Sequence, residues 1–423
     1  MIESVEKFGD TYSVYSGFKR MILTQDPDLI DYVLKKNHKN YYKSKMVSQK
    51  LGRFIGHGLL TSNGPYWLQQ RRLIQPGFHI QRIQGLYSIM KKTIDDFLSI
   101  FPVGDEVEIY PRMNRLAFEI VTRTLFDVDV PAQAMNDLSS FISDTQEFLI
   151  RDIRQPHKSW WHVLSGEVRR NIKKASAARE ILRSIIRQRK ESTKKFNDLL
   201  DMLLEARYEE SGEPMTEDQI LDEILILMIA GHETTANALS WTLYLLAGHP
   251  EELEKLRRST KDIGLEECVN HERLAAVISE SMRLYPPAWV SDRVALADDT
   301  FKGYSFPRNT IIVLFYYGLH RNEHYWTDAS SFKPERFVYL TSGSASRGTG
   351  SKPGNPKMAY YPFGGGPRLC IGNHFALAEM AIFLQAFIHR LNITTTAVVP
   401  RMNPMVTLRP DNIVLGIERR GTD

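Results

Sequence analysis

The spacing of apolar residues changes along the chain, and each spacing predicts a different kind of element. Residues 12–17 and 19–24 alternate apolar and polar side chains around a glycine, which predicts a β-hairpin. The Asp26-Pro27 pair that follows is typical of a helix start, because Asp caps the first turn and Pro needs no amide partner there. From about residue 64 to 257 apolar residues recur at helical spacing, so we expect the middle of the chain to be mainly α.

Strand-like patterns return near the end of the chain. Residues 293–296 and 310–315 are strand-like runs, and an alternating segment at 404–417 contains the turn sequence Pro410-Asp411-Asn412. No linker divides the chain, and the low-complexity stretch Thr341–Pro356 is predicted to be a surface loop. We therefore predict one domain, residues 1–423, that is mainly α with small peripheral β-sheets.

Composition restricts the class of protein. With 43% hydrophobic and 25% charged residues in 423 positions, the chain can bury a core large enough to enclose a cofactor. Its net charge of +4 is far below the balance of a nucleic-acid-binding protein. The N-terminus has no apolar signal segment, and no stretch reaches the ~20 apolar residues of a membrane span. We expect a cytoplasmic monomer with no membrane span and no nucleic-acid partner.

One local feature could suggest nucleic acid instead. Residues 166–195 are rich in Lys and Arg. They also keep an apolar stripe, which favours a helix with a solvated outer face. The stripe consists of Val168, Ile172, Leu182, Ile185 and Ile186.

The chain has two cysteines, Cys268 and Cys370, which are too few for a disulfide framework or a multi-cysteine metal site. Cys370 follows a glycine-rich run and stands just before a helical pattern that begins at Asn373. Unpaired N–H groups and the helix dipole favour an anion at such a position, so its sulfur is predicted to be a thiolate. Cys268 has no such surroundings and is interpreted as a buried structural cysteine.

Residues 363–372, FGGGPRLCIG, match the pattern F-G-x-G-x-R-x-C-x-G, so the chain resembles the cytochrome P450 family of haem-thiolate monooxygenases. The resemblance implies the P450 fold and haem b (iron protoporphyrin IX), with Cys370 as the metal ligand. It also implies that Phe363, Arg368 and Gly372 bind the cofactor, and that O2 is a co-substrate. A thiolate on haem iron promotes O–O cleavage, which is the chemistry that these enzymes use.

Two further segments agree with this resemblance. Residues 280–283, Glu-Ser-Met-Arg, resemble the family's E-x-x-R helix, and residues 334–337, Pro-Glu-Arg-Phe, resemble its later P-E-R-F segment. Glu and Arg three residues apart share one helix face, and a second Arg from a loop can complete a buried network around the carboxylate. We expect Glu280, Arg283 and Arg336 to support the cysteine loop structurally.

A third segment, residues 230–235, lies in a long helix predicted from about 217 to 246 that is apolar all round before it. Its sequence AGHETT resembles the family's A-G-x-E-T-T motif, which implies catalytic roles for Glu233 and Thr234 in proton relay. Gly231 weakens the helix by ~1 kcal/mol, so we expect a local opening there that leaves space for dioxygen. A zinc site of the His-Glu-x-x-His type is excluded because Ala236 occupies the second His position.

A fourth segment, Trp67 to Arg71, resembles the family's W-x-x-x-R helix. Trp and Arg one turn apart can both donate to a haem propionate. The resemblance adds Arg293 and Arg368 as further donors, so all four are expected to bind the cofactor.

The resemblance also bears on partners. The family's proline-rich leader is absent before Ile2, so we expect a short or trimmed leader. A fused flavin reductase does not fit in 423 residues, so electrons are expected from NAD(P)H through a separate ferredoxin or flavodoxin with its reductase. We expect that partner, which is acidic, to dock on a basic face with Arg72, Lys91 and Lys92.

The resemblance places substrate contacts in four mainly apolar segments, namely Lys45–Leu60, Leu227–Thr234, Ala288–Ser291 and Met405–Thr407. Hydroxylation of a small hydrophobic substrate, such as a fatty acid, terpenoid or macrocycle, is therefore favoured. Three polar side chains, those of Trp289, Ser291 and Thr407, leave open oxidative O-demethylation of a methoxylated or sugar-like molecule.

Other haem-thiolate proteins also remain as alternatives. An isomerase, a dehydratase, a peroxygenase or a non-catalytic haem sensor would share the cysteine loop. None of these would need the acid and alcohol pair of Glu233 and Thr234.

Overall fold

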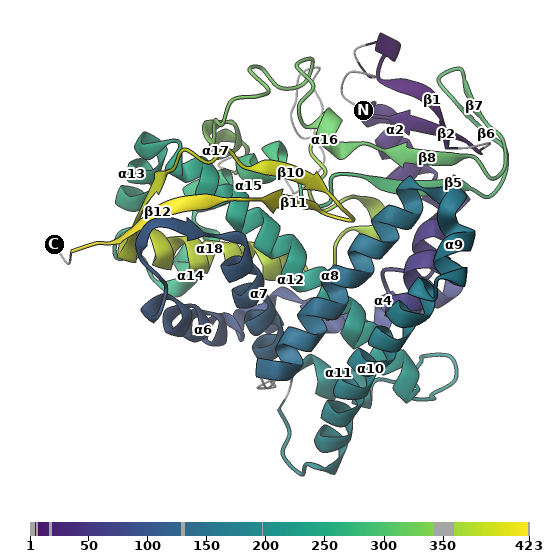
Figure 1. The fold of residues 1–423 in the computed structure, drawn as a ribbon, viewed down its shortest axis with the longest axis horizontal. Coiled ribbons are helices and arrows are strands. Elements are labelled where there is room, and N and C mark those ends of the chain that lie inside the picture. The colour runs from purple at the N-terminus through teal and green to yellow at the C-terminus, as the bar shows by residue number, and fades with distance from the viewer. Residues whose placement is uncertain are drawn as a thin grey trace. The chain divides into compact units, whose positions relative to one another are not determined.

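The computed structural model describes residues 5, 7–16, 19–127, 132–196, 198–341 and 359–421. The chain forms two compact units, each built from segments that are distant in sequence. Unit 1 contains Met1–Tyr41, Ile83–Ala117 and Glu233–Asp423, and unit 2 contains Tyr42–Arg82 and Phe118–His232. Figure 1 shows long helices with small sheets, which confirms the predicted fold class. The loop predicted at Thr341–Pro356 lies, from residue 342 on, outside the described residues.

The helices divide between the units as follows. Unit 1 contains α2 (Pro27–Asp31), α6 (Tyr87–Ser99), α13 (Pro250–Ser259), α14 (Leu265–Asn270), α15 (Glu272–Leu284), α16 (Tyr316–Leu319), α17 (Glu335–Thr341) and α18 (Asn373–Arg390). Unit 2 contains α3 (Gly52–Ile55), α4 (Gly64–Ile74), α8 (Ala132–Arg154), α9 (Ser159–Leu164), α10 (Glu167–Glu191) and α11 (Leu199–Glu205). Three helices carry residues of both units: α5 (Ile80–Gln84), α7 (Tyr110–Leu125) and α12 (Glu217–Ala247).

Short 3₁₀ and π-helical segments connect these helices. They are η1 (Tyr32–Lys36), η2 (His38–Asn40), η3 (Met46–Leu51), η4 (Gln75–Phe78), η5 (Pro156–Lys158) and η7 (Gly366–Arg368). At the predicted helix start, the Asp26 side chain accepts a hydrogen bond from the Asp28 amide and Pro27 occupies the first turn, which confirms the cap of α2.

The largest sheet of unit 1 has the strand order β1-β2-β8-β5-β3. Its strands are β1 (Thr11–Ser16), β2 (Lys19–Thr24), β3 (Tyr41–Tyr42), β5 (Ser291–Ala295) and β8 (Ile311–Leu314). The predicted N-terminal hairpin is confirmed, since β1 pairs antiparallel with β2 from Thr11 opposite Thr24 to Ser16 opposite Lys19. Figure 1 shows these strands beside the β6–β7 hairpin (Asp299–Phe301 and Tyr304–Phe306). The strands predicted at 293–296 and 310–315 are therefore confirmed as β5 and β8.

The C-terminal strands differ from the predicted single alternating segment. The observed hairpin pairs β10 (Arg401–Pro404) with β11 (Leu408–Asp411), so its turn is at residues 405–407. Asn412 has a positive φ of 59°, so the chain does turn there, but the next strand leaves for another sheet. That strand, β12 (Val414–Arg419), lies between β9 (Leu391–Thr395) and β4 (Gly104–Glu108). Strand β4 also interrupts the region that we predicted to be mainly helical.

The two helices with unusual composition fold as their patterns predict. In α10 the apolar side turns inward, and Arg169, Arg170 and Lys173 are exposed, as expected for a solvated outer face. Arg189 is the exception, because it is buried and pairs with Asp198 and Asp201 at 2.7 Å. Helix α12 begins with two acidic residues, which suit the positive end of the helix dipole, and is then buried over most of its length. Within the described residues, no helix is both long enough and apolar enough to cross a membrane.

Candidate active site

The cysteine loop is a compact turn that ends just before α18. The Cys370 amide donates to the Phe363 carbonyl at 3.0 Å, and the Gly364 amide donates to the Tyr361 carbonyl at 3.1 Å. Gly372 caps α18, so Cys370 stands three residues before the first helical residue, as predicted. Cys370 is exposed. Cys268 is buried, and burial raises the pKa of its thiol to about 12. The sulfur that the loop presents is therefore the one suited to ligation.

The loop is seated against the end of η1. Gly366 has a φ of +68°, and a Cβ built on it would lie 1.9 Å from the Leu34 carbonyl oxygen. Both the backbone conformation and this close approach require glycine at that position. The approach ties the loop to the N-terminal part of unit 1.

A buried ion-pair network lies behind the loop. Glu280 and Arg283 on α15 are both fully buried and form two hydrogen bonds, from Nε to Oε2 at 2.7 Å and from Nη2 to Oε1 at 2.8 Å. Arg336 adds a contact from its Nε to Glu280 Oε1 at 3.3 Å, and the Lys333 amide donates to the same oxygen at 2.9 Å. The three side chains expected to meet do so, and Arg336 comes from the start of α17.

One residue that sequence reasoning missed joins this network to the loop. Arg283 Nη1 donates to the His320 carbonyl at 2.7 Å, and the His320 side chain accepts at Nε2 from the Tyr361 amide at 2.9 Å. Burial and the charge of Arg283 lower the His320 pKa to about 3, so this imidazole is neutral and can accept. His320 lies in no motif, and its role follows from the tertiary structure alone.

The acid and alcohol of α12 have different surroundings. Glu233 is buried and its Oε1 accepts from the Thr407 hydroxyl at 2.6 Å, whereas Thr234 is half-buried. Asn237, one helical turn later, donates from Nδ2 to the Thr407 hydroxyl oxygen at 2.9 Å. The acid is thus bonded to the β10–β11 turn, and Asn237 of α12 donates to the same Thr407 hydroxyl.

The residues around this pair change the prediction made for Gly231. The chain is α-helical throughout Glu217–Ala247, so the helix does not open at Gly231 as we expected. Gly231 serves packing instead, because a Cβ there would lie 2.9 Å from Val121 Cγ2. His232 is buried, and its Nδ1 is 2.8 Å from the Met228 carbonyl. Among the described residues, no group of His, Cys, Asp and Glu is arranged to hold a metal ion.

The predicted propionate donors are split between the units. Arg293 on β5 is buried in unit 1, and in the described chain its guanidinium makes one hydrogen bond, from Nη1 to the Asp292 carbonyl at 2.6 Å. Arg368 is half-buried in η7 of the same unit. Trp67 and Arg71 are half-buried on α4 of unit 2, one turn apart.

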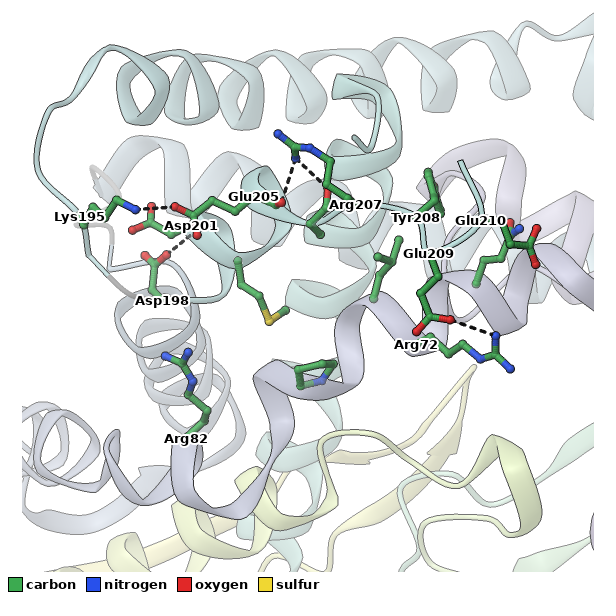
Figure 2. A pocket seen from close by; sticks show the side chains of 15 residues that line it. Arg72, Arg82, Lys195, Asp198, Asp201, Glu205, Arg207, Tyr208, Glu209 and Glu210 are labelled. Carbon is green, nitrogen blue, oxygen red and sulfur yellow. Dashed lines mark hydrogen bonds and ion pairs between the residues drawn. The ribbon is translucent and has the colours of Figure 1, made fainter. Parts of the chain in front are cut away.

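A well-defined cavity lies elsewhere, in unit 2. It measures about 410 Å³ and is lined by residues of α4, η4 and the segment 195–210 and by Arg82 of α5, with none of the candidate site residues. Figure 2 shows ion pairs along it, Lys195 with Glu205 at 2.8 Å and Arg72 with Glu209 at 3.6 Å. Arg72 therefore faces acidic neighbours, which weakens its assignment to a basic docking face.

Two more buried acids were not predicted. Glu379 on α18 is fully buried, and neither carboxyl oxygen has a hydrogen-bond partner in the described chain. Burial raises its pKa well above the usual value. Glu223 on α12 accepts from the Leu59 amide at 2.9 Å, and burial raises its pKa to about 8, with a further contribution from Asp222.

Comparison with known proteins places this chain in the cytochrome P450 family, whose sequence model, described as Cytochrome P450, matches residues 1–417. Cyclooctat-9-en-7-ol 5-monooxygenase of Streptomyces melanosporofaciens is 27% identical over 395 residues, covering 92% of this chain and 83% of that protein. 11-oxo-beta-amyrin 30-oxidase of Glycyrrhiza uralensis is 27% identical over 436 residues, covering 96% and 80%. The crystal structure of the cytochrome P450DA heme domain has the same fold, with a TM-score of 0.85 at 21% identity over 99% of this chain and 92% of that chain. The protein is a P450-family monooxygenase.

The residues of unit 1 fit the haem that this family carries. Cys370 supplies an exposed sulfur at a helix start, and a Cβ built on Gly364 of the same loop would meet no atom within 4 Å. Arg293 is a buried guanidinium whose further N–H donors suit an anionic acceptor such as a propionate.

Proposed function

We propose that this protein binds haem b through Cys370 and inserts one oxygen atom of O2 into a C–H bond of a small hydrophobic molecule. The observation that carries the proposal is the exposed Cys370 in a loop supported from behind by the buried chain Glu280, Arg283 and His320. When bound, a thiolate-ligated haem supplies dioxygen activation. Trp67, Arg71, Arg293 and Arg368 would hold its propionates, and Phe363 and Gly372 would shape the loop beneath it.

Two residues of α12 have the chemistry for proton handling. Thr234 is half-buried and can pass a proton to a group beside the helix, and Glu233 stands next to it with a fixed carboxylate. An isomerase, a dehydratase, a peroxygenase or a haem sensor would not need this pair.

The substrate is expected to be apolar. The three polar side chains that could recognise a sugar-like or methoxylated molecule are all engaged inside the protein. Trp289 Nε1 donates to the Met405 carbonyl at 3.1 Å, the Ser291 hydroxyl lies 2.7 Å from the Tyr316 hydroxyl, and Thr407 donates to Glu233. The two relatives named for oxidising cyclooctat-9-en-7-ol and 11-oxo-beta-amyrin support a terpenoid-like substrate. Electrons would come from a separate ferredoxin or flavodoxin with its reductase.

The test of the ligand is spectroscopic. Reduction with dithionite under CO should give the red-shifted Soret band of a thiolate-ligated haem, and Cys370→His should abolish it. Cys268→Ala is the matched control and should keep the band, because Cys268 is buried on α14 with its sulfur 3.5 Å from the Ala381 carbonyl oxygen. A band that survives in Cys370→His but disappears in Cys268→Ala would reverse the assignment.

The proton-relay role is tested by the fraction of consumed dioxygen that is released as hydrogen peroxide. Thr234→Ala should keep haem binding but release a larger fraction of the consumed dioxygen as hydrogen peroxide, since a proton donor is lost. An unchanged peroxide fraction would contradict the proton-relay role.

A further inference from the structure

The turn between β10 and β11 reaches the acid of α12 through the side chain of Thr407. Thr407 lies in this turn and is buried. The turn is fastened to the segment after α15, because Trp289 Nε1 donates to the Met405 carbonyl at 3.1 Å and the Leu408 amide donates to the Pro287 carbonyl at 2.9 Å. These two hydrogen bonds hold the turn that carries Thr407 to a segment outside α12.

The direction of the hydrogen bonds follows from counting donors. A threonine hydroxyl has one hydrogen to donate. The Thr407 oxygen accepts from Asn237 Nδ2 at 2.9 Å, so its hydrogen is left for Glu233 Oε1 at 2.6 Å. The opposite amide orientation would place Asn237 Oδ1 and Glu233 Oε1 in competition for the same hydrogen. The observed orientation avoids this and fixes one oxygen of the Glu233 carboxylate.

We propose that Thr407 is the positioning residue of Glu233, so that the β10–β11 turn sets the orientation of the acid in the proton relay. The inference rests on the proposed function, which gives Glu233 its role. A hydrogen bond to a carboxylate is about twice as strong as one between neutral groups, so its loss frees a buried side chain to rotate. The same turn belongs to a segment expected to touch the substrate, so a bound molecule that moves the turn changes the supply of protons.

The first test is structural and needs no turnover. In the haem-loaded protein, the infrared difference between the parent and Glu233→Gln identifies the carboxylate band of Glu233. Thr407→Val keeps the shape of the side chain but removes the hydroxyl, and should shift that band. Thr407→Ser keeps the hydroxyl and should restore the parent band. An unshifted band in Thr407→Val overturns the inference.

The second test measures how dioxygen is consumed without substrate, with a surrogate ferredoxin, its reductase and NADPH. Thr407→Val should raise the ratio of hydrogen peroxide to water about tenfold, and Thr407→Ser should stay within twofold of the parent. The matched control is Thr242→Val, since Thr242 is a buried hydroxyl on the same helix that donates to Ala238 and lies 2.8 Å from the Ser281 hydroxyl. This control should match the parent.

The two proposals fail in different ways. If Thr234→Ala raises the peroxide ratio and Thr407→Val does not, the relay stands and the positioning role is wrong. If neither variant changes the ratio, the relay itself is wrong and the positioning role is lost with it. An equal rise in Thr242→Val would assign the effect to general loosening of α12 and overturn the specific role of Thr407.

Discussion

Two buried glutamates, one in each unit, show opposite ways of placing a carboxyl group in a protein interior. Glu280 in unit 1 is surrounded by donors, with Arg283, Arg336 and the Lys333 amide all directed at its two oxygens. Glu223 in unit 2 receives one backbone amide, and its sequence neighbour Asp222 adds negative charge. Cations and hydrogen-bond donors around a buried carboxyl group favour its ionised form, whereas burial by itself favours the protonated form. The surroundings of Glu280 could be predicted from the E-x-x-R motif in the sequence. No motif in the sequence indicates the surroundings of Glu223.

The largest effect is expected at Glu280, whose negative charge is compensated by two arginines. Glu280→Gln leaves the Arg283 guanidinium buried without its counter-charge, which should cost about 3–5 kcal/mol of stability. The midpoint of urea unfolding should fall strongly, and the expressed protein should retain little haem because the loop support includes Arg283 and His320.

The control for this prediction is an exposed ion pair. Glu254 on α13 pairs with exposed Arg258 at 3.3 Å, so Glu254→Gln should change stability by less than ~1 kcal/mol. Equal midpoints for the Glu280 and Glu254 variants would show that burial of the Glu280 pair is not important for stability.

The second prediction concerns Glu223 and pH. Its pKa rises from the model-peptide value of 4.5 to about 8 on folding, so the native state holds a proton that the unfolded chain releases. Its favourable contribution is complete below pH 4.5 and is lost as the pH rises through about 8. A shift of this size corresponds to roughly 5 kcal/mol at most.

Glu223→Gln should remove this pH dependence. The variant should therefore gain stability relative to the parent as the pH is raised from 6 to 9, measured as the difference in unfolding midpoint at each pH. Glu213→Gln, at an exposed position before α12, should follow the parent curve. A variant whose difference from the parent is the same at every pH would show that Glu223 is ionised throughout the range.

The smallest effect is expected for Glu379, whose carboxyl group has no hydrogen-bond partner among the residues that the structure describes. Glu379 is fully buried, and burial raises its pKa well above the usual value, which favours the neutral carboxyl group. Burial favours the neutral form of Glu379, and Glu379→Gln puts a neutral amide of similar shape in its place, so stability at pH 7 should change by less than ~1 kcal/mol. A loss as large as that of Glu280→Gln would indicate an ionised Glu379 and would end the contrast between buried acids with and without cations.

The residues that could be predicted are those whose chemistry is local. Cys370 with its glycines, and Glu280 with Arg283, act through neighbours a few positions away, so their spacing in the sequence carries the information. Thr407 could be placed near the substrate only by resemblance, and its bond to Glu233 spans 174 positions. His320 likewise acts through Tyr361, 41 positions later.

The C-terminal strands show the same limit in the fold. Pro410-Asp411-Asn412 has the composition of a turn, and Asn412 does adopt a positive φ. Whether a turn joins two strands of one sheet depends on which partner each strand finds. Here β12 pairs with β4 and β9, and no property of residues 404–417 specifies those partners.

The pairing of β4 with β12 also sets a schedule for biosynthesis. Glu108 lies opposite Val414 in this pairing. At the usual rate of translation, Val414 is added to the chain roughly 15–60 s after Glu108. During that interval β4 lacks the neighbour that will cover its edge, and an uncovered strand invites aggregation. Its sequence, Gly-Asp-Glu-Val-Glu, has one buried apolar side chain and three carboxylates. Those carboxylates repel the same strand of another nascent chain. Among the described strands, β4 has the longest interval before its partner is synthesised, and its charges oppose aggregation during that interval.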